Sequence, residues 1–106
     1  MNIRWSEGAL LEFAETLTYV AREFGQQAAK KMRDNINEAI SSIAQFPYIG
    51  KVTFSDKELS VEFHELAVKL SSIIYFIYED EIFIVSIWSN RQDRNKLYSE
   101  LKKQSL

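Results

Sequence analysis

The spacing of apolar residues along this chain changes sharply near Pro47, the only proline. Before it, apolar side chains recur three or four residues apart over 10–24 and again over 28–43, which places them on one face of each of two helices. Gly25 separates these stretches, and glycine readily adopts the left-handed conformation that ends many helices. After Gly50 the apolar residues alternate, which is the period of a strand. The N-terminal half is therefore predicted to form a helical hairpin and the C-terminal half a sheet.

The expected strands differ in how many of their faces are apolar. Alternation predicts short strands over 52–54 and 59–63, and the parity of the apolar residues changes at Glu65. A β-bulge or a change in which sheet face is covered would explain this change of parity. The runs 72–78 and 82–88 are almost continuously apolar, with an acidic turn between them. We therefore expect them to be central antiparallel strands.

Short elements are expected at both ends of the chain. A brief strand is predicted over 3–5, followed by Ser6 as a helix cap, and Asp93 is predicted to cap a last helix that buries Leu97 and Leu101. The order is then β-α-α-β-β-β-β-α. It describes an α+β fold with a short N-terminal strand, a long α-hairpin packed on one face of a mainly antiparallel sheet, and a short C-terminal helix. The opposite sheet face is expected to stay partly open and to hold a groove.

Length and composition restrict what this fold can carry. A chain of 106 residues fits one domain, expected to span residues 1–106. The chain has no cysteine and His64 is its single histidine, so we expect neither a metal site nor a cofactor. No stretch approaches the roughly 20 apolar residues of a membrane span or resembles a signal peptide, so a cytoplasmic protein without membrane contact is expected. The net charge of −2 argues against strong non-specific attraction to nucleic acid.

Four segments, taken in order, resemble the RelE/ParE family of bacterial toxins. They are the Ile3-Arg4-Trp5-Ser6 opening, the Phe46-Pro47-x-x-Gly50 helix exit, the Ile73-Ile74-Tyr75 strand and the Arg91-Gln92-Asp93 segment. The resemblance extends over nearly the whole chain. It implies the toxin of a type II toxin–antitoxin module, of the kind associated with plasmid stabilisation and growth inhibition. It also implies a cognate antitoxin that is partly disordered and folds on contact with the toxin.

The resemblance implies one of two toxic activities, which are binding to DNA gyrase and cleavage of messenger RNA on the ribosome. Metal-independent RNA cleavage needs a proton acceptor and cationic donors around one phosphate. His64 is the candidate base or acid, although a lone histidine on a strand is commonly structural. Arg91 is the candidate phosphate clamp, or else the partner of a carboxylate in this chain or in the antitoxin. Lys51, Arg94 and Tyr98 are candidate helpers in the same reaction.

Departures from the family pattern favour binding over cleavage. His64 stands where the family commonly has arginine, and Arg94 replaces a proline that many relatives have after Gln-Asp. The low net charge is also unlike the strongly basic ribonuclease members. Inhibition of gyrase is therefore the preferred hypothesis, ribosome-dependent RNA cleavage the alternative, and an inactive member serving as a binding module a third.

Binding requires exposed anchors and free backbone. Tyr48 and Trp88 lie near the ends of predicted elements and are the aromatic residues expected to be exposed. The short first strand and the parity change at Glu65 indicate a free sheet edge, to which an extended antitoxin segment could add a strand.

Overall fold

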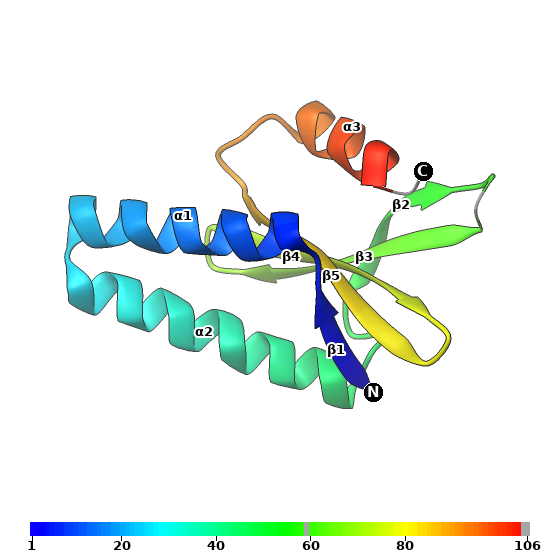
Figure 1. Ribbon diagram of the computed structural model, residues 1–106, viewed down its shortest axis with the longest axis horizontal. Helices are drawn as coiled ribbons and strands as arrows, with labels where there is room; N and C mark the ends of the chain where they lie inside the picture. The colour runs from blue at the N-terminus through cyan, green and yellow to red at the C-terminus, as the bar shows by residue number, and fades with distance from the viewer. Residues whose placement is uncertain (59, 105–106) are drawn as a thin grey trace.

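The helices and strands follow one another in the order that the apolar spacing predicts (Figure 1). The computed structural model describes residues 1–58 and 60–104, so Leu59, predicted to begin a strand, lies outside the described residues. The α+β fold, with its long helical hairpin and C-terminal helix, is confirmed. The elements are β1 (Asn2–Trp5), α1 (Glu7–Phe24), α2 (Gln26–Gln45), β2 (Lys51–Asp56), β3 (Val61–Val68), β4 (Ser71–Tyr78), β5 (Glu81–Ser89) and α3 (Arg94–Gln104).

Local contacts explain where the helices begin and end. The Ser6 hydroxyl accepts a hydrogen bond from the Ala9 amide at 3.0 Å, as expected of a cap at the start of α1. Gly25 has a φ of +97°, a backbone conformation that side chains disfavour, so a single glycine reverses the chain between α1 and α2. The Asp93 carboxylate accepts from the Asn95 amide at 2.9 Å and caps α3 as predicted.

The sheet has the strand order β1-β5-β4-β3-β2. β1 runs parallel to β5, and the remaining neighbours are antiparallel. The two most apolar strands, β4 and β5, lie side by side within the sheet as their composition predicts. The short strands β1 and β2 form its two edges, which confirms the expectation of an edge at the first strand.

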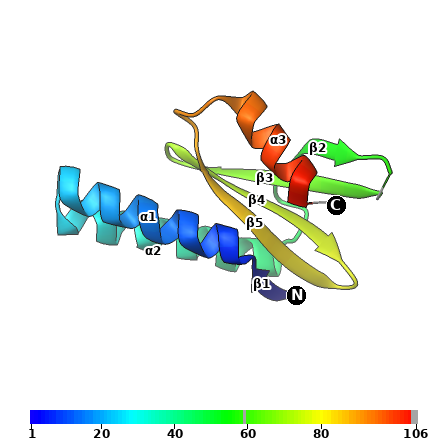
Figure 2. The same ribbon diagram turned by 45° about the horizontal axis from the view of Figure 1, so that its top comes forward.

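Helices cover both faces of this sheet, and each face has its own apolar cluster (Figure 2). Ile36 and Ile43 of α2 pack with isoleucines of β4 and β5 on the hairpin face. Leu97 and Leu101 of α3 pack on Phe63 and on other apolar residues of the opposite face. The expectation of a partly open second face is therefore corrected over the area that α3 covers.

The parity change in β3 marks a change of covered face. Phe63 packs under α3, whereas Leu66 and Val68 pack against the hairpin cluster. The pairing of β3 with β4 runs without a shift through Glu65, so the bulge explanation is wrong for this strand. The register shifts instead lie in the pairings on either side, of β2 with β3 and of β4 with β5.

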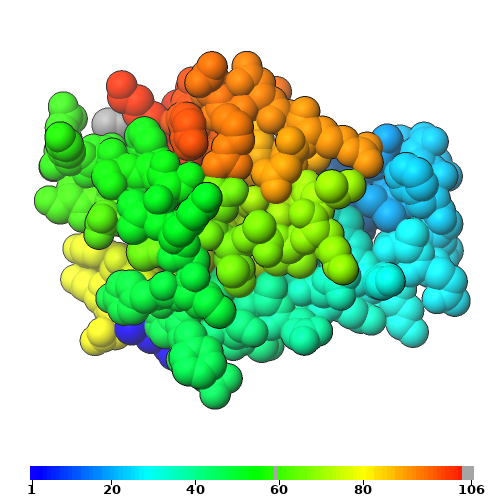
Figure 3. Space-filling view, turned by 180° about the vertical axis from the view of Figure 1, so that it is seen from behind, coloured from blue at the N-terminus to red at the C-terminus, as the bar shows by residue number. Residues whose placement is uncertain are grey.

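The two aromatic residues expected to be exposed differ. Tyr48 is 72% exposed and confirms the expectation, whereas Trp88 is only 3% exposed because it packs in the cluster beneath α3. The segment that follows α2, which contains Tyr48, projects from the lower edge of the molecule in Figure 3. Within the part of the chain that the structure describes, no helix is both long and apolar enough to cross a membrane.

Candidate functional site

The candidate residues do not form a single cluster. His64 lies under the segment between α2 and β2, and Arg94 and Tyr98 lie together where α3 meets β2 and β3. Arg91 lies on the loop after β5, where it lines a groove beside the helical hairpin. Lys51 is exposed at the start of β2, opposite Glu65 in the strand register.

His64 is buried and holds the backbone of the preceding segment. Its Nδ1 lies 2.9 Å from the carbonyl oxygen of Gly50, and because a carbonyl only accepts, Nδ1 carries the proton and donates it. The imidazole stacks on Tyr75 with ring centres 5.3 Å apart and meets the edge of Tyr48 at 5.8 Å. These contacts are those of a side chain that fixes local structure.

Tyr75 completes this anchor from the neighbouring strand. Its hydroxyl donates to the Pro47 carbonyl at 2.7 Å and accepts from the Gly50 amide at 2.9 Å, and burial raises the pKa of Tyr75. A Cβ at Gly50 would lie 2.8 Å from that hydroxyl oxygen and 3.0 Å from the Glu65 carbonyl oxygen, so only glycine fits there. The helix-exit motif and the Ile-Ile-Tyr motif are distant in the sequence but are thus in direct contact in the fold.

A partly buried ion pair fixes the start of α3. Arg94 binds Glu65 through two parallel hydrogen bonds, from Nη1 to Oε2 at 2.9 Å and from Nη2 to Oε1 at 2.5 Å. Ser72 donates to the same carboxylate at 2.6 Å, and Arg94 donates to the Thr53 hydroxyl at 3.2 Å. The Arg94 guanidinium, with help from these hydroxyls, lowers the pKa of Glu65 to about 2. Hydrogen bonding to Glu65 raises the pKa of Arg94 in turn.

Tyr98 lies beside this pair. The Arg94 guanidinium carbon is 5.7 Å from the centre of the Tyr98 ring, and hydrogen bonding with Arg94 and then Thr53 lowers the pKa of Tyr98. Phe54 of β2 stacks on the Tyr98 ring, with ring centres 5.8 Å apart. Two of the candidate helpers, Arg94 and Tyr98, are therefore brought together beside the Glu65 carboxylate.

Glu65 is the residue of this cluster that the sequence interpretation missed. It continues the parity of Val61 and Phe63, which is the side of β3 that α3 covers. A carboxylate in that position needs a cationic partner, since burying an unpaired charge is costly. The alternation in the sequence therefore contained the signal for an ion pair, but not the identity of its partner.

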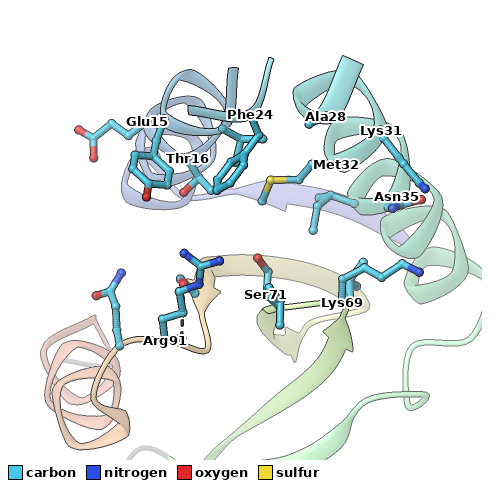
Figure 4. A pocket seen from close by; sticks show the side chains of 17 residues that line it. Glu15, Thr16, Phe24, Ala28, Lys31, Met32, Asn35, Lys69, Ser71 and Arg91 are labelled. Carbon is cyan, nitrogen blue, oxygen red and sulfur yellow. Dashed lines mark hydrogen bonds between the residues drawn. The ribbon is translucent and has the colours of Figure 1, made fainter. Parts of the chain in front are cut away.

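Arg91 lines a groove of about 720 Å³, between the far end of the hairpin and the turn from β3 to β4. The groove exists because α1 and α2 extend beyond the sheet (Figure 1). Its apolar lining includes Val20, Met32 and Leu70, while Lys31, Lys69 and Arg91 contribute positive charge and Glu15 a negative one. Figure 4 shows Arg91 extending from the loop after β5 toward α1. The arrangement suits an elongated apolar ligand with acidic flanks.

The family model described as "ParE toxin of type II toxin-antitoxin system, parDE" matches residues 3–94, which include every candidate residue except Tyr98. No curated protein sequence matches the chain significantly.

The chain also matches solved structures, two of which come from toxin–antitoxin systems. A chain described as "Chromosomal ParDE TA system from P. aeruginosa" has a TM-score of 0.69 and 19% identity, with 84% of this chain and 95% of that chain covered. A chain of the heterotetrameric YoeB-YefM toxin-antitoxin complex from Staphylococcus aureus has a TM-score of 0.47 and 24% identity, with 83% and 94% covered. At these identities, it is the fold of the P. aeruginosa chain that this chain shares.

Proposed function

Because the chain belongs to the ParE toxin family of type II toxin–antitoxin systems, we propose that it inhibits DNA gyrase by binding and is neutralised by a cognate antitoxin. The family match makes it the toxin component of such a module. We expect this toxin to arrest growth from the cytoplasm of its bacterium, and its module to act in plasmid stabilisation.

The observation that favours binding over RNA cleavage is the separation of the groups that cleavage would require. Cleavage needs a proton acceptor and an available cation at one phosphate. His64 is buried and donates to a backbone carbonyl, Arg94 is neutralised by Glu65, and Arg91 lies in the groove. A toxin that acts by binding needs no such set, so this arrangement supports binding.

Ribosome-dependent RNA cleavage is the second candidate, and one observation favours it. Arg94 lowers the pKa of Tyr98, which would raise the fraction of the phenol that is deprotonated and free to accept a proton. Arg94 would then have to exchange Glu65 for a phosphate. His64, Lys51 and Arg91 remain its candidate partners in that reaction.

The groove beside the hairpin is our proposed site for part of the antitoxin. A partly disordered segment can fold its apolar side chains into such a groove, while acidic residues meet the cationic rim. Lys31, Lys69 and Arg91 supply that rim. The edge strands β1 and β2 offer backbone groups for a further, extended part of the same partner.

Expression without antitoxin tests the target. Wild type, Arg91→Ala and Tyr98→Phe are compared for growth arrest, inhibition of gyrase supercoiling and cleavage of ribosome-bound messenger RNA. We expect the wild type to inhibit supercoiling without cutting RNA, and Tyr98→Phe to do the same. RNA cleavage that is lost in Tyr98→Phe would select the ribonuclease instead, and normal growth with wild type would select the inactive binding module.

A further inference from the structure

The segment between α2 and β2 carries its apolar side chains on the outside. Phe46 is 58% exposed, Tyr48 72% and Ile49 49%, and Tyr48 is the most exposed large apolar side chain among the described residues. Together these three residues form an apolar knob. Exposed aromatic side chains in one short segment are typical of residues that dominate binding energy at protein interfaces.

The backbone of the knob is fixed from beneath by buried polar side chains. Tyr75 bonds both to the Pro47 carbonyl and to the Gly50 amide, and His64 donates to the Gly50 carbonyl. Burying a phenol and an imidazole costs free energy unless both are hydrogen-bonded. Here both groups bond to the backbone of a segment whose own apolar side chains are largely exposed. A segment held in one conformation loses less entropy when it binds a partner.

Charged side chains are also sparse along the chain on either side of the knob. Between Glu38 and Asp56 the only charged residue is Lys51, whereas charged residues make up 26% of the whole chain. Interface cores show the same two features, depletion of charge and enrichment in aromatic residues. The groove beside the hairpin differs from the knob, because three cations and one carboxylate line it.

Shape separates these two surfaces as well. The groove is concave and can accept a flexible segment, whereas the segment carrying the knob projects from the edge of the molecule (Figure 3). A rigid projection buries most of its area when it enters a preformed cleft in a folded partner. Two copies meeting knob to knob would bury much less, because both surfaces are convex.

We propose that Phe46, Tyr48 and Ile49 form the anchor by which this toxin inserts into an apolar cleft of its folded target. This inference rests on the proposed function, in which the target is DNA gyrase. The knob is then the target-binding surface, while the groove serves the antitoxin. The two partners would therefore contact residues that do not overlap in sequence.

The test compares Tyr48→Ser and Phe46→Ser with Leu11→Ser, a matched control at a 61% exposed position on α1. Each variant is purified from its antitoxin complex, checked by circular dichroism and thermal unfolding, and titrated against purified gyrase. We expect Tyr48→Ser to weaken gyrase binding about 30-fold, with Leu11→Ser and antitoxin affinity unchanged. Unchanged gyrase binding by both folded knob variants would overturn the proposal.

Tyr75→Phe tests the role of rigidity without touching the exposed surface. It keeps the ring but removes both hydrogen bonds to the segment. Gyrase binding should therefore weaken even though the Tyr48 side chain itself is unaltered. Accelerated amide exchange at Gly50 would show that the segment is loosened. If this variant then binds gyrase as tightly as wild type, rigidity of the segment plays no part in binding.

Failure of the target and failure of the knob give different results. If wild type binds no gyrase, the target is wrong, and growth arrest then decides the knob. Arrest lost in the folded Tyr48→Ser but kept in Leu11→Ser supports a knob for another target, whereas arrest kept in both overturns it. Wild-type dimers in sedimentation that Tyr48→Ser abolishes would also overturn it, because the knob would then join two copies.

Discussion

The two faces of the sheet are covered in different ways. On one face two long helices bury a continuous apolar stripe, in which Ile36 and Ile43 are at most 1% exposed. On the other face a helix of only 11 residues buries Leu97 and Leu101, and its first residue is bonded to Glu65. Long amphipathic helices bury enough area to hold themselves in place. A short helix gains less from burial, and here a directed ion pair sets its position.

The largest effect is expected on the hairpin face. Ile36→Ala leaves a cavity between α2 and the sheet, and we expect it to lower the free energy of unfolding by about 3 kcal/mol. Urea unfolding at pH 7 measures this, with Leu10→Ala at a 52% exposed position as control. A loss no larger than that of the control would show that the hairpin does not dominate stability.

A smaller effect is expected on the α3 face. Glu65→Gln keeps the shape but removes the charge that pairs with Arg94, and we expect a loss of about 2 kcal/mol, moderated by the partial exposure of Arg94. Glu62→Gln, on the same strand but exposed, should cost almost nothing. Amide exchange should accelerate in α3 and remain unchanged in α2. Equal acceleration in both helices would mean that the two faces unfold as one unit.

Acid should distinguish Glu65 from Glu12, a carboxyl of α1 whose pKa is raised by burial beside Ser86. The pKa of Glu65 is about 2 in the folded chain and near 4.5 when unfolded, so its contribution is complete above pH 4.5 and is lost as pH falls toward 2. We expect that loss to be roughly 1–3 kcal/mol. The contribution of Glu12 to stability has the opposite sign. Because folding raises the pKa of Glu12, this carboxyl lowers the free energy of unfolding as the pH rises above its pKa in the unfolded chain.

Unfolding midpoints of wild type, Glu65→Gln and Glu12→Gln between pH 3 and pH 7 measure these contributions. The acid-induced loss should shrink in Glu65→Gln. Glu12→Gln should instead gain stability relative to wild type at pH 7. An acid profile of Glu65→Gln that is identical to wild type would contradict the role given to the ion pair.

The smallest effect on stability is expected at Arg91, which belongs to neither face. Arg91→Ala should change the free energy of unfolding by less than about 0.5 kcal/mol, because the residue is exposed in a loop. We expect it to weaken binding of an acidic antitoxin peptide several-fold, and more at low salt than at high salt. Lys96→Ala, exposed on α3 and outside the groove, is the control. The same loss in both variants would point to general charge attraction.

The difference between the faces also explains what the sequence could predict. The helical stripes are regular patterns, so the hairpin follows from spacing alone. The parity change at Glu65 allowed either a bulge or a change of covered face, and the strand pairing decided between them. The burial of Trp88 does not follow, because it depends on where α3 comes to lie after a loop. The partner of Glu65 and the groove that Arg91 lines depend on tertiary placement in the same way. His64 could be selected by its chemistry, but its bond to Gly50 could not.

β1 has a consequence for the synthesis of this protein. Its four residues are made before the other strands of the sheet, yet they pair with Glu81–Ile84 of β5, the last of these strands to be made. A chain still being translated therefore exposes an unpaired first strand, and the hairpin lacks part of the sheet beneath it, until β5 has been made.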